Sequence, residues 1–596
     1  MTLIFDGGFD RTLDELLKTY GRASARGTRL DAWLFDDAPS RRAAEVKFRE
    51  YGVEATLRSA YKPLLHFFLE EVDLTELASI VIKYPVHGAC PNNRFLLETY
   101  PLAGLTGATE ISFETGTTND FFYDVALLYK DGRRAEHVIF APNRRHTDFI
   151  GETLISPTGW IKVNGEAVGK RIETDYETLF LTAMRIITDY NWGNSEPYFD
   201  ELNIRANLPV SDQILPVGQE IISLREALHE DLYFSLLEVF QKKSGRPLGD
   251  RGLQPGHIIP EILQSNDSRS TLTIETVALN ASLPGGALQP LATASSPIAF
   301  SQVRDELAKI NGDAFEVYTR TGRVVKARYR HGTDAAVMIS GGQHPNETTG
   351  IVGALRAAQQ LNLRPGAHFT VSPLENPDGY AVHHRLRADN PQHMHHAARY
   401  TALGDDLEYR TDVNLYEKGI RTQAERLSGA QLHVNLHGYP AHEWTRPLSG
   451  YVPRGFSMWT LPKGFFLIMR YQEGWSEPAE RLIDAVTKHL TAVPGLMELN
   501  DRQIRLYETH AGETGFRIIN GFPCMISMDN RHTVPLTLIT EYPDETIYDE
   551  AFVAGHTAQM ETVLAAYDAL QQCLTMPEDS PRFSSIHAIS HIRHRR

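Results

Sequence analysis

The sequence predicts an α/β protein built on a mixed β-sheet flanked by helices, with an additional N-terminal α+β region. Three observations lead to this prediction. After residue 298, short apolar runs alternate with helical or loop segments. Residues 80–163 instead carry short β-branched and aromatic runs, which favour strands. Between Leu283 and Pro297 the chain becomes rich in Pro, Gly, Ala and Ser, a composition typical of a domain boundary.

The length of 596 residues exceeds what one hydrophobic core usually organises, so we expect two or three domains. Residues 1–290 form the N-terminal region, which contains one or two subdomains. Residues 298–575 form the α/β domain, and residues 576–596 form a basic tail that we expect to be frayed.

Composition excludes several classes of protein. The net charge of -16 argues against nonspecific nucleic-acid binding, which relies on clustered Lys and Arg. No apolar run approaches the roughly 20 residues of a membrane helix, so we expect no membrane association. The N-terminus shows no secretory pattern, which favours a cytoplasmic protein. The three cysteines lack paired spacing, so a zinc site would have to use His and carboxylate ligands.

The N-terminal region begins with two predicted helices, at 12–20 and 40–51. Strands are expected at 80–82, 121–129 and 137–140, the last two joined by an Asp131-Gly132 turn. Helices follow at 175–190 and 230–243, where apolar residues recur at three- and four-residue steps. No motif in this region indicates a reaction, so its function is not predicted.

The first motif of the α/β domain is a pair of metal-ligand residues between a strand and a helix. Residues 335–340 form an apolar run of the kind found in buried strands, and residues 348–361 have helical spacing. His344 and Glu347 lie in the turn between them. The carboxyl ends of strands are where ligand sites form in open α/β sheets. The pair therefore predicts a metal site that needs a third ligand.

A second apolar run, residues 432–439, supplies that ligand. Strand alternation places His433, Asn435 and His437 on one face. The alternative is that both histidines are hydrogen-bonded strand residues. Because an H-x-x-E pair is present, we expect His437 to bind the metal and His433 to be structural.

Two further groups are candidates for catalysis. Glu541 ends the predicted strand 536–540, and a Glu beside a metal-activated water can accept its proton and pass it to a leaving amine. The alternative is an exposed carboxylate at a strand end. Arg385 and Arg387 follow the turn sequence Asn376-Pro377-Asp378-Gly379, and an Arg near a metal can stabilise an oxyanion. The alternative is that these arginines are surface residues without a catalytic role.

Taken in chain order, H-x-x-E, N-P-D-G, a strand-end His and a late-strand Glu resemble the zinc carboxypeptidase family related to carboxypeptidases A and B. The resemblance covers about residues 300–575. It implies a mixed sheet flanked by helices and a Zn²⁺ ion bound by His344, Glu347 and His437. It also implies that Glu541 is the general base.

The substrate end of this pattern differs from the family. Digestive members carry an Asn-Arg pair that binds the substrate carboxylate, and the best counterpart here is Asn414 followed by Leu415. The Tyr expected before the catalytic Glu is not evident. Arg446 is a further candidate for binding a substrate carboxylate, with an exposed loop Arg as the alternative. We expect the histidines at 393–396 to form a lid or to pack, with a second metal site as the alternative. Trp459, Phe465 and Phe466 are expected to lie in the core.

These expectations together predict a zinc-dependent metallopeptidase that hydrolyses an amide bond in a peptide or modified peptide. One alternative is a deacylase or amidase of small N-acyl amino acids, resembling aspartoacylase and succinylglutamate desuccinylase. Another is a binding protein with an inactive metallopeptidase-like domain. Peptides or small amides are thus the expected partners. Neither the physiological substrate nor the oligomeric state follows from the sequence.

Overall fold

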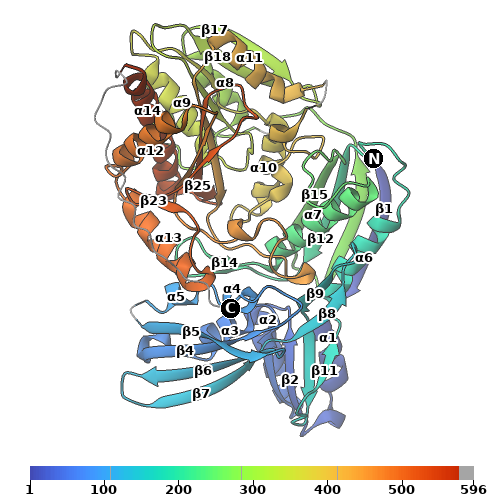
Figure 1. The fold of residues 1–596 in the computed structure, drawn as a ribbon. Helices are drawn as coiled ribbons and strands as arrows, with labels where there is room; N and C mark the ends of the chain where they lie inside the picture. Colours follow the sequence, from blue (N-terminus) through green and yellow to red (C-terminus); the bar gives the residue numbers. More distant parts are fainter. Residues whose placement is uncertain (108, 284, 412–413, 576–596) are drawn as a thin grey trace, which may run out of the picture.

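The computed structural model describes residues 1–107, 109–283, 285–411 and 414–575 (Figure 1). The predicted basic tail, residues 576–596, lies outside this range. The part of the chain from residue 298 onward is built on a nine-stranded sheet, shown in yellow-green to red in Figure 1. In spatial order its strands are β17 (Asp313–Tyr318), β18 (Val324–Arg330), β20 (Phe369–Ser372), β19 (Val337–Gly341), β21 (Leu432–Pro440), β25 (Leu536–Glu545), β22 (Phe466–Tyr471), β24 (Phe522–Met528) and β23 (Arg517–Ile519).

The sheet is mixed, which confirms the predicted fold class. Strands β20, β19, β21 and β25 are parallel neighbours, while β22 runs antiparallel to β25. The helices of this part are α8 (Phe300–Ala308), α9 (Thr349–Leu361), α10 (Pro377–Asp389), α11 (Gly419–Ser428), α12 (Ser476–Leu490), α13 (Leu496–Ala511) and α14 (Asp549–Thr575). Helices α9, α12 and α14 share one hydrophobic core with the sheet, and α11 packs across β17, β18, β19 and β20.

Strand alternation decides which side chains enter that core. In β21, Leu432, Val434 and Leu436 face α9 and α14, and their neighbours His433 and His437 face the opposite side. Strands β25 and β22 alternate in the same way. The polar face of the three strands is therefore free to form a site.

The N-terminal region contains smaller sheets. One has the order β1 (Thr2–Asp10), β16 (Arg269–Val277), β12 (Glu201–Leu208) and β15 (His257–Gln264). A second consists of β11 (Lys170–Ile172), β10 (Gly159–Val163), β2 (Arg29–Leu34) and β3 (Glu54–Ser59). A third consists of β5 (Glu110–Thr118), β4 (Leu77–Val86), β6 (Phe122–Tyr129) and β7 (Arg134–Phe140), shown in blue in Figure 1. Two-stranded pairs join β8 (Asn143–Thr147) to β9 (Thr153–Pro157) and β13 (Gln213–Ile214) to β14 (Ile221–Ile222).

The helices of this region include α1 (Thr12–Tyr20), α2 (Ala38–Glu50), α3 (Pro63–Glu70), α6 (Asp175–Asp189) and α7 (Leu224–Lys243). Helix α7 begins earlier than the sequence predicts, at Leu224 instead of residue 230. Its first two turns are buried on every side, including Arg225 and Glu226, so they lack the amphipathic periodicity that marks a surface helix.

Helix α7 also joins the two parts of the chain. His442 lies 2.8 Å from Glu226, Glu230 pairs with His396, and Arg446 donates to Glu238 over 3.0 Å. The apolar core of the N-terminal region continues into the second part through Met394, Trp444 and other residues. Within the described residues, no helix has both the length and the apolar composition needed to cross a membrane.

Candidate metal centre and active site

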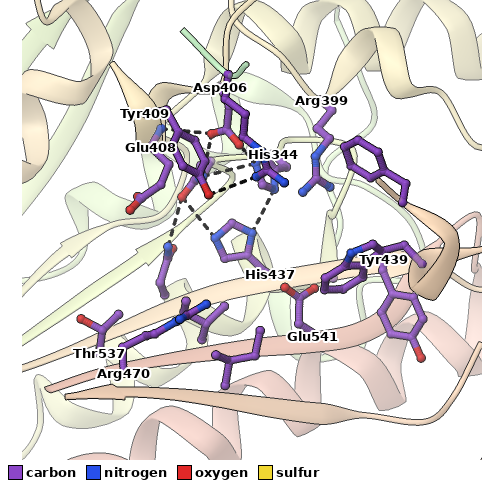
Figure 2. Close-up of a pocket in the computed structure, with 18 of the residues that line it drawn as sticks. His344, Arg399, Asp406, Glu408, Tyr409, His437, Tyr439, Arg470, Thr537 and Glu541 are labelled. Carbon is purple, nitrogen blue, oxygen red and sulfur yellow. Dashed lines mark hydrogen bonds and ion pairs between the residues drawn. The ribbon is translucent and has the colours of Figure 1, made fainter. Parts of the chain in front are cut away.

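The three predicted metal ligands come together at the carboxyl ends of two neighbouring strands. His344 and Glu347 lie in the loop between β19 and α9, and His437 lies in β21 beside β19. One ligand atom from each residue lies within 4.8 Å of the other two, and all three side chains are buried. Figure 2 shows His344 and His437 facing one another across the pocket.

The donor atoms lie close enough together to share one metal ion. Nδ1 of His344 lies 3.0 Å from Nδ1 of His437. Each Nδ1 atom lies 2.9 Å from a different carboxylate oxygen of Glu347. Tetrahedral zinc with Zn–N bonds near 2.05 Å separates two nitrogen ligands by about 3.3 Å. Two imidazoles and one carboxylate directed at one point therefore fit a zinc ion with an open position.

The loop that carries His344 and Glu347 is fixed at both ends. Gly342 has a φ of 60°, and a Cβ there would lie 2.8 Å from Leu374, so glycine is required at this turn. At the other end, Asp544 of β25 accepts hydrogen bonds from the backbone N–H of Thr349 at 2.9 Å and from its hydroxyl at 2.6 Å. Asn346 donates to Glu545 over 2.6 Å. The polar end of β25 thus positions the start of α9 and the ligands before it.

Further polar groups orient the two imidazoles from behind. Nε2 of His344 lies 3.2 Å from Asp406, and Nε2 of His437 lies 3.2 Å from Oε1 of Gln343. Arg421 in turn donates to Gln343 over 2.5 Å and pairs with Glu375 at 2.6 Å. Outer partners of this kind fix the tautomer and ring orientation of ligating histidines.

Glu347 is held in its ionised form. The N–H of Gly438 donates to Oε2 over 3.0 Å, and Arg399 donates to Oε1 over 2.6 Å. Burial alone would raise the pKa of Glu347, but the charges of His344 and Arg399 outweigh burial and leave the pKa well below its ordinary value. An ionised carboxylate is the form that binds a metal.

Glu541 faces the same pocket. It lies in β25 directly opposite His437 of β21 and is 8% exposed. Among the described residues it has neither a hydrogen-bond nor an ion-pair partner, and Figure 2 shows its carboxylate directed toward the space beside His437. Burial raises the pKa of Glu541 well above its ordinary value, and the charge of Glu347 adds to this effect. Nearby, burial lowers the pKa of Lys463 to about 7.

Arg399 has no counterpart among the residues predicted from the sequence. It follows the 3₁₀ turn η4 (His396–Ala398), lines the pocket and contacts Glu347. Its surrounding sequence, Ala397-Ala398-Arg399-Tyr400, has neither motif nor periodicity, so no local signal identifies it. The preceding histidines, His393, His395 and His396, are buried, which agrees with the predicted packing role. His396 pairs with Glu230.

The structure does not bring Arg385 and Arg387 to the pocket. Both lie in the later turns of α10, roughly 12–15 Å along the helix from its start. Arg385 pairs with Glu201 of β12 at 2.9 Å, and Arg387 lies beside the hydroxyl of Tyr548. The helix that starts at the N-P-D-G turn carries both guanidinium groups away from the ligands.

Asn414 and Arg446 also lie outside the pocket. Asn414 is exposed, and its predicted neighbours Asp412 and Val413 are outside the described residues. Arg446 is fully buried, where it donates to Glu238 over 3.0 Å and to Ser235 over 3.1 Å. Its partners lie more than 200 positions earlier in the chain, so the sequence gives no sign of this pairing.

The pocket is instead lined by the segment that begins at Asp406 and includes Glu408 and Tyr409. Aromatic side chains complete its wall. Phe465 and Phe466 are fully buried, in line with the predicted core role, but Trp459 is half-buried and lines the pocket.

The chain was compared with protein-family models, curated proteins and solved structures. No protein-family model and no curated protein matches the chain. Among solved structures, the chain is similar to a metallo-carboxypeptidase from Burkholderia cenocepacia, with 13% identity, a TM-score of 0.29, and coverage of 51% of this chain and 77% of that chain. It is also similar to a metallo-carboxypeptidase from Pseudomonas aeruginosa in complex with (2-guanidinoethylmercapto)succinic acid. The identity is 14%, the TM-score is 0.28, and the match covers 52% of this chain and 72% of that chain. A third similar structure is a succinylglutamate desuccinylase/aspartoacylase from Rhodobacter sphaeroides, with 12% identity, a TM-score of 0.24, and coverage of 43% of this chain and 65% of that chain.

Proposed function

We propose that this protein is a zinc-dependent hydrolase of amide bonds, with His344, Glu347 and His437 as the metal ligands. One observation carries the proposal: the unpaired carboxylate of Glu541 faces the same pocket as His344 and His437, whose ligand atoms converge with that of Glu347. Bound zinc would supply Lewis-acid activation of a water and of the substrate carbonyl.

Glu541 is the proposed general base. Its carboxylate has no competing partner among the described residues, so it is available to accept a proton from the attacking water. The same group then donates that proton to the nitrogen of the leaving amine. General catalysis is most effective when the pKa lies near the working pH, and the raised pKa of Glu541 moves in that direction.

Arg399 is the proposed source of positive charge beside the reacting carbonyl. Its guanidinium lies at the rim of the ligand set, 2.6 Å from Glu347, and lines the pocket. A fixed cation in this position favours the negative charge that develops on the carbonyl oxygen. Arg399 thus replaces Arg385 and Arg387 in the proposed mechanism.

A substrate screen with metal analysis tests the proposal. The full chain is loaded with zinc, its metal content is measured by mass spectrometry, and it is assayed on peptides and on N-acyl amino acids with and without chelator. We expect one zinc per chain and hydrolysis that chelation abolishes. Activity confined to N-acyl amino acids would identify a deacylase. Failure to bind zinc on titration would overturn the proposal in favour of an inactive binding protein.

A further inference from the structure

Three adjacent strands form the floor of the pocket, and its two ends carry different side chains. Register places His437 of β21 beside Glu541 of β25 at one end and His433 beside Thr537 at the other. Arg470 of β22 lies opposite Thr537 and lines the pocket with it. Four residues of strand separate the two ends, a distance of about 13 Å. Figure 2 shows Arg470 on the same layer as Glu541, on the side away from Tyr439.

Arg470 is a half-buried cation without an anionic partner. Its hydrogen-bond partner is the neutral hydroxyl of Ser527, at 3.1 Å. Within the described part of the chain, no carboxylate lies within ion-pair distance of its guanidinium. Taking a charge partly out of water without a counter-charge is unfavourable, so this site favours binding of an anion.

Other arginines of the pocket already have carboxylate partners. Three are paired with carboxylates at 2.6 Å: Arg399 with Glu347, Arg421 with Glu375, and Arg531 with Asp529. Glu408, the acidic group on the opposite wall, is itself paired with Arg421 at 2.6 Å and with His532 at 3.2 Å. Arg251, exposed at the mouth, contacts the hydroxyl of Tyr409. Among the described residues, Arg470 is therefore the half-buried guanidinium of the pocket that lacks a carboxylate partner.

The surroundings of Arg470 suit a carboxylate. Between it and the ligand end lie Ile468 and Ile539, which exclude water from the floor and strengthen a charge interaction there. A guanidinium binds a carboxylate through two parallel N–H bonds. In a C-terminal glutamate, the main-chain carboxyl carbon is two bonds from the scissile nitrogen, whereas the side-chain carboxyl carbon is four bonds away. Because Arg470 lies at the far end of the floor from the ligands, the side-chain carboxylate is the better placed of the two to reach it.

We propose that Arg470 binds a side-chain carboxylate of the substrate, so that this protein acts on amides of acidic amino acids such as glutamate. The proposal rests on the hydrolase function described above, because the ligand end of the pocket is taken as the place of bond cleavage. It names Arg470 as a specificity-determining residue.

Paired substrates test it. We expect the zinc-loaded full chain to hydrolyse N-acetyl-Ala-Glu with a kcat/KM about 10- to 100-fold higher than N-acetyl-Ala-Gln, the range of a charged hydrogen bond. Arg470→Gln should bring this ratio near one, and Arg470→Lys should restore part of it. The control Arg517→Gln, at an exposed arginine that pairs with Glu480 outside the pocket, should keep the wild-type ratio. A wild-type ratio near one, or an unchanged ratio in folded Arg470→Gln, would overturn the proposal.

Binding supplies a readout that does not depend on turnover. Zinc-loaded Glu541→Gln protein is titrated calorimetrically with the same two dipeptides and with N-acetyl-Ala-Glu amide. We expect both glutamyl ligands to bind with a lower Kd than N-acetyl-Ala-Gln. This difference in Kd should disappear in the double variant Glu541→Gln/Arg470→Gln. Preference for a free terminal carboxylate over the glutamyl side chain would refute the assignment. Preferential binding without hydrolysis of any amide would instead leave Arg470 supported and overturn the proposed hydrolase.

Discussion

Nε2 of His344 lies 3.2 Å from Oδ2 of Asp406, on the side of the ring opposite its 2.9 Å contact with Glu347. In the neutral form of His344, which is the form that binds metal, a carboxylate in this position holds the proton on Nε2 and leaves Nδ1 free. Both groups are buried, so water does not replace the carboxylate when it is removed. Asp406 therefore positions His344 although it does not itself belong to the ligand set.

We expect Asp406→Asn to weaken zinc binding about 10- to 100-fold, the usual cost of losing such a partner. Competition between the protein and a chromophoric chelator measures the change. Asp405→Asn is the matched control, because Asp405 pairs with Arg410 at 2.6 Å and not with a ligand. Wild-type zinc affinity in Asp406→Asn would contradict the positioning role.

Glu541→Gln separates catalysis from metal binding. Since Glu541 accepts no hydrogen bond from a ligand, we expect zinc content to remain at the wild-type level. Loss of the general base should lower kcat by about 10²- to 10⁴-fold on any substrate that the wild-type protein hydrolyses. Glu480→Gln, at a surface carboxylate paired with Arg517, is the control. Unimpaired kcat in the zinc-loaded variant would remove Glu541 from the mechanism.

Zinc should also stabilise the fold, because the ligands come from two elements about 90 positions apart in the chain, the loop before α9 and strand β21. A ligand that binds the folded state alone stabilises it by about 4 kcal/mol when present at 1,000 times its Kd. We expect chelation to lower the thermal unfolding midpoint of the wild-type protein. In His437→Ala, which removes one ligand, the midpoint should no longer respond to zinc or chelator. An equal response in both proteins would place the metal elsewhere.

The sequence predicts the ligand end of the site better than the substrate end, for a physical reason. His344 and Glu347 lie between β19 and α9, and His437 lies in β21; the periodicity of these elements is visible in the sequence, so the convergence of the three side chains follows from sheet geometry. Asp406 and Arg399 lie in irregular segments and act through contacts made across the fold. No local pattern records such contacts.

The same limit explains the fate of the predicted substrate-binding arginine. Arg446 follows closely after the strand that carries His437, which makes it a reasonable candidate for the pocket. Its partner Glu238 lies in α7, which is buried on most of its surface and shows little amphipathic periodicity. Arg470, by contrast, looks like an ordinary strand residue in the sequence. Only the register of β22 against β25 shows that it faces the pocket.

The pairing of Arg446 with Glu238 makes stability depend on pH. Burial alone would raise the pKa of Glu238, but Arg446 and Arg454 outweigh it and lower this pKa to about 2 from an ordinary value of 4.5. Because the folded-state pKa is lower than the unfolded-state value, the carboxylate stabilises the fold above pH 4.5. This contribution, roughly 3 kcal/mol at neutral pH, is lost as the pH falls toward 2.

We therefore expect Glu238→Gln to lower the free energy of unfolding at pH 7 by roughly 3 kcal/mol, since buried Arg446 loses its charged partner and Arg454 keeps only Asp148. The difference from wild type should shrink steadily as the pH is lowered from 5 to 3, because protonation removes the same charge from the wild-type protein. Urea unfolding at a series of pH values measures this difference. Glu480→Gln should stay within about 0.5 kcal/mol of wild type throughout, because exposed ion pairs contribute little. A gap that is the same at every pH would mean that Glu238 stabilises the junction by packing and not by its charge.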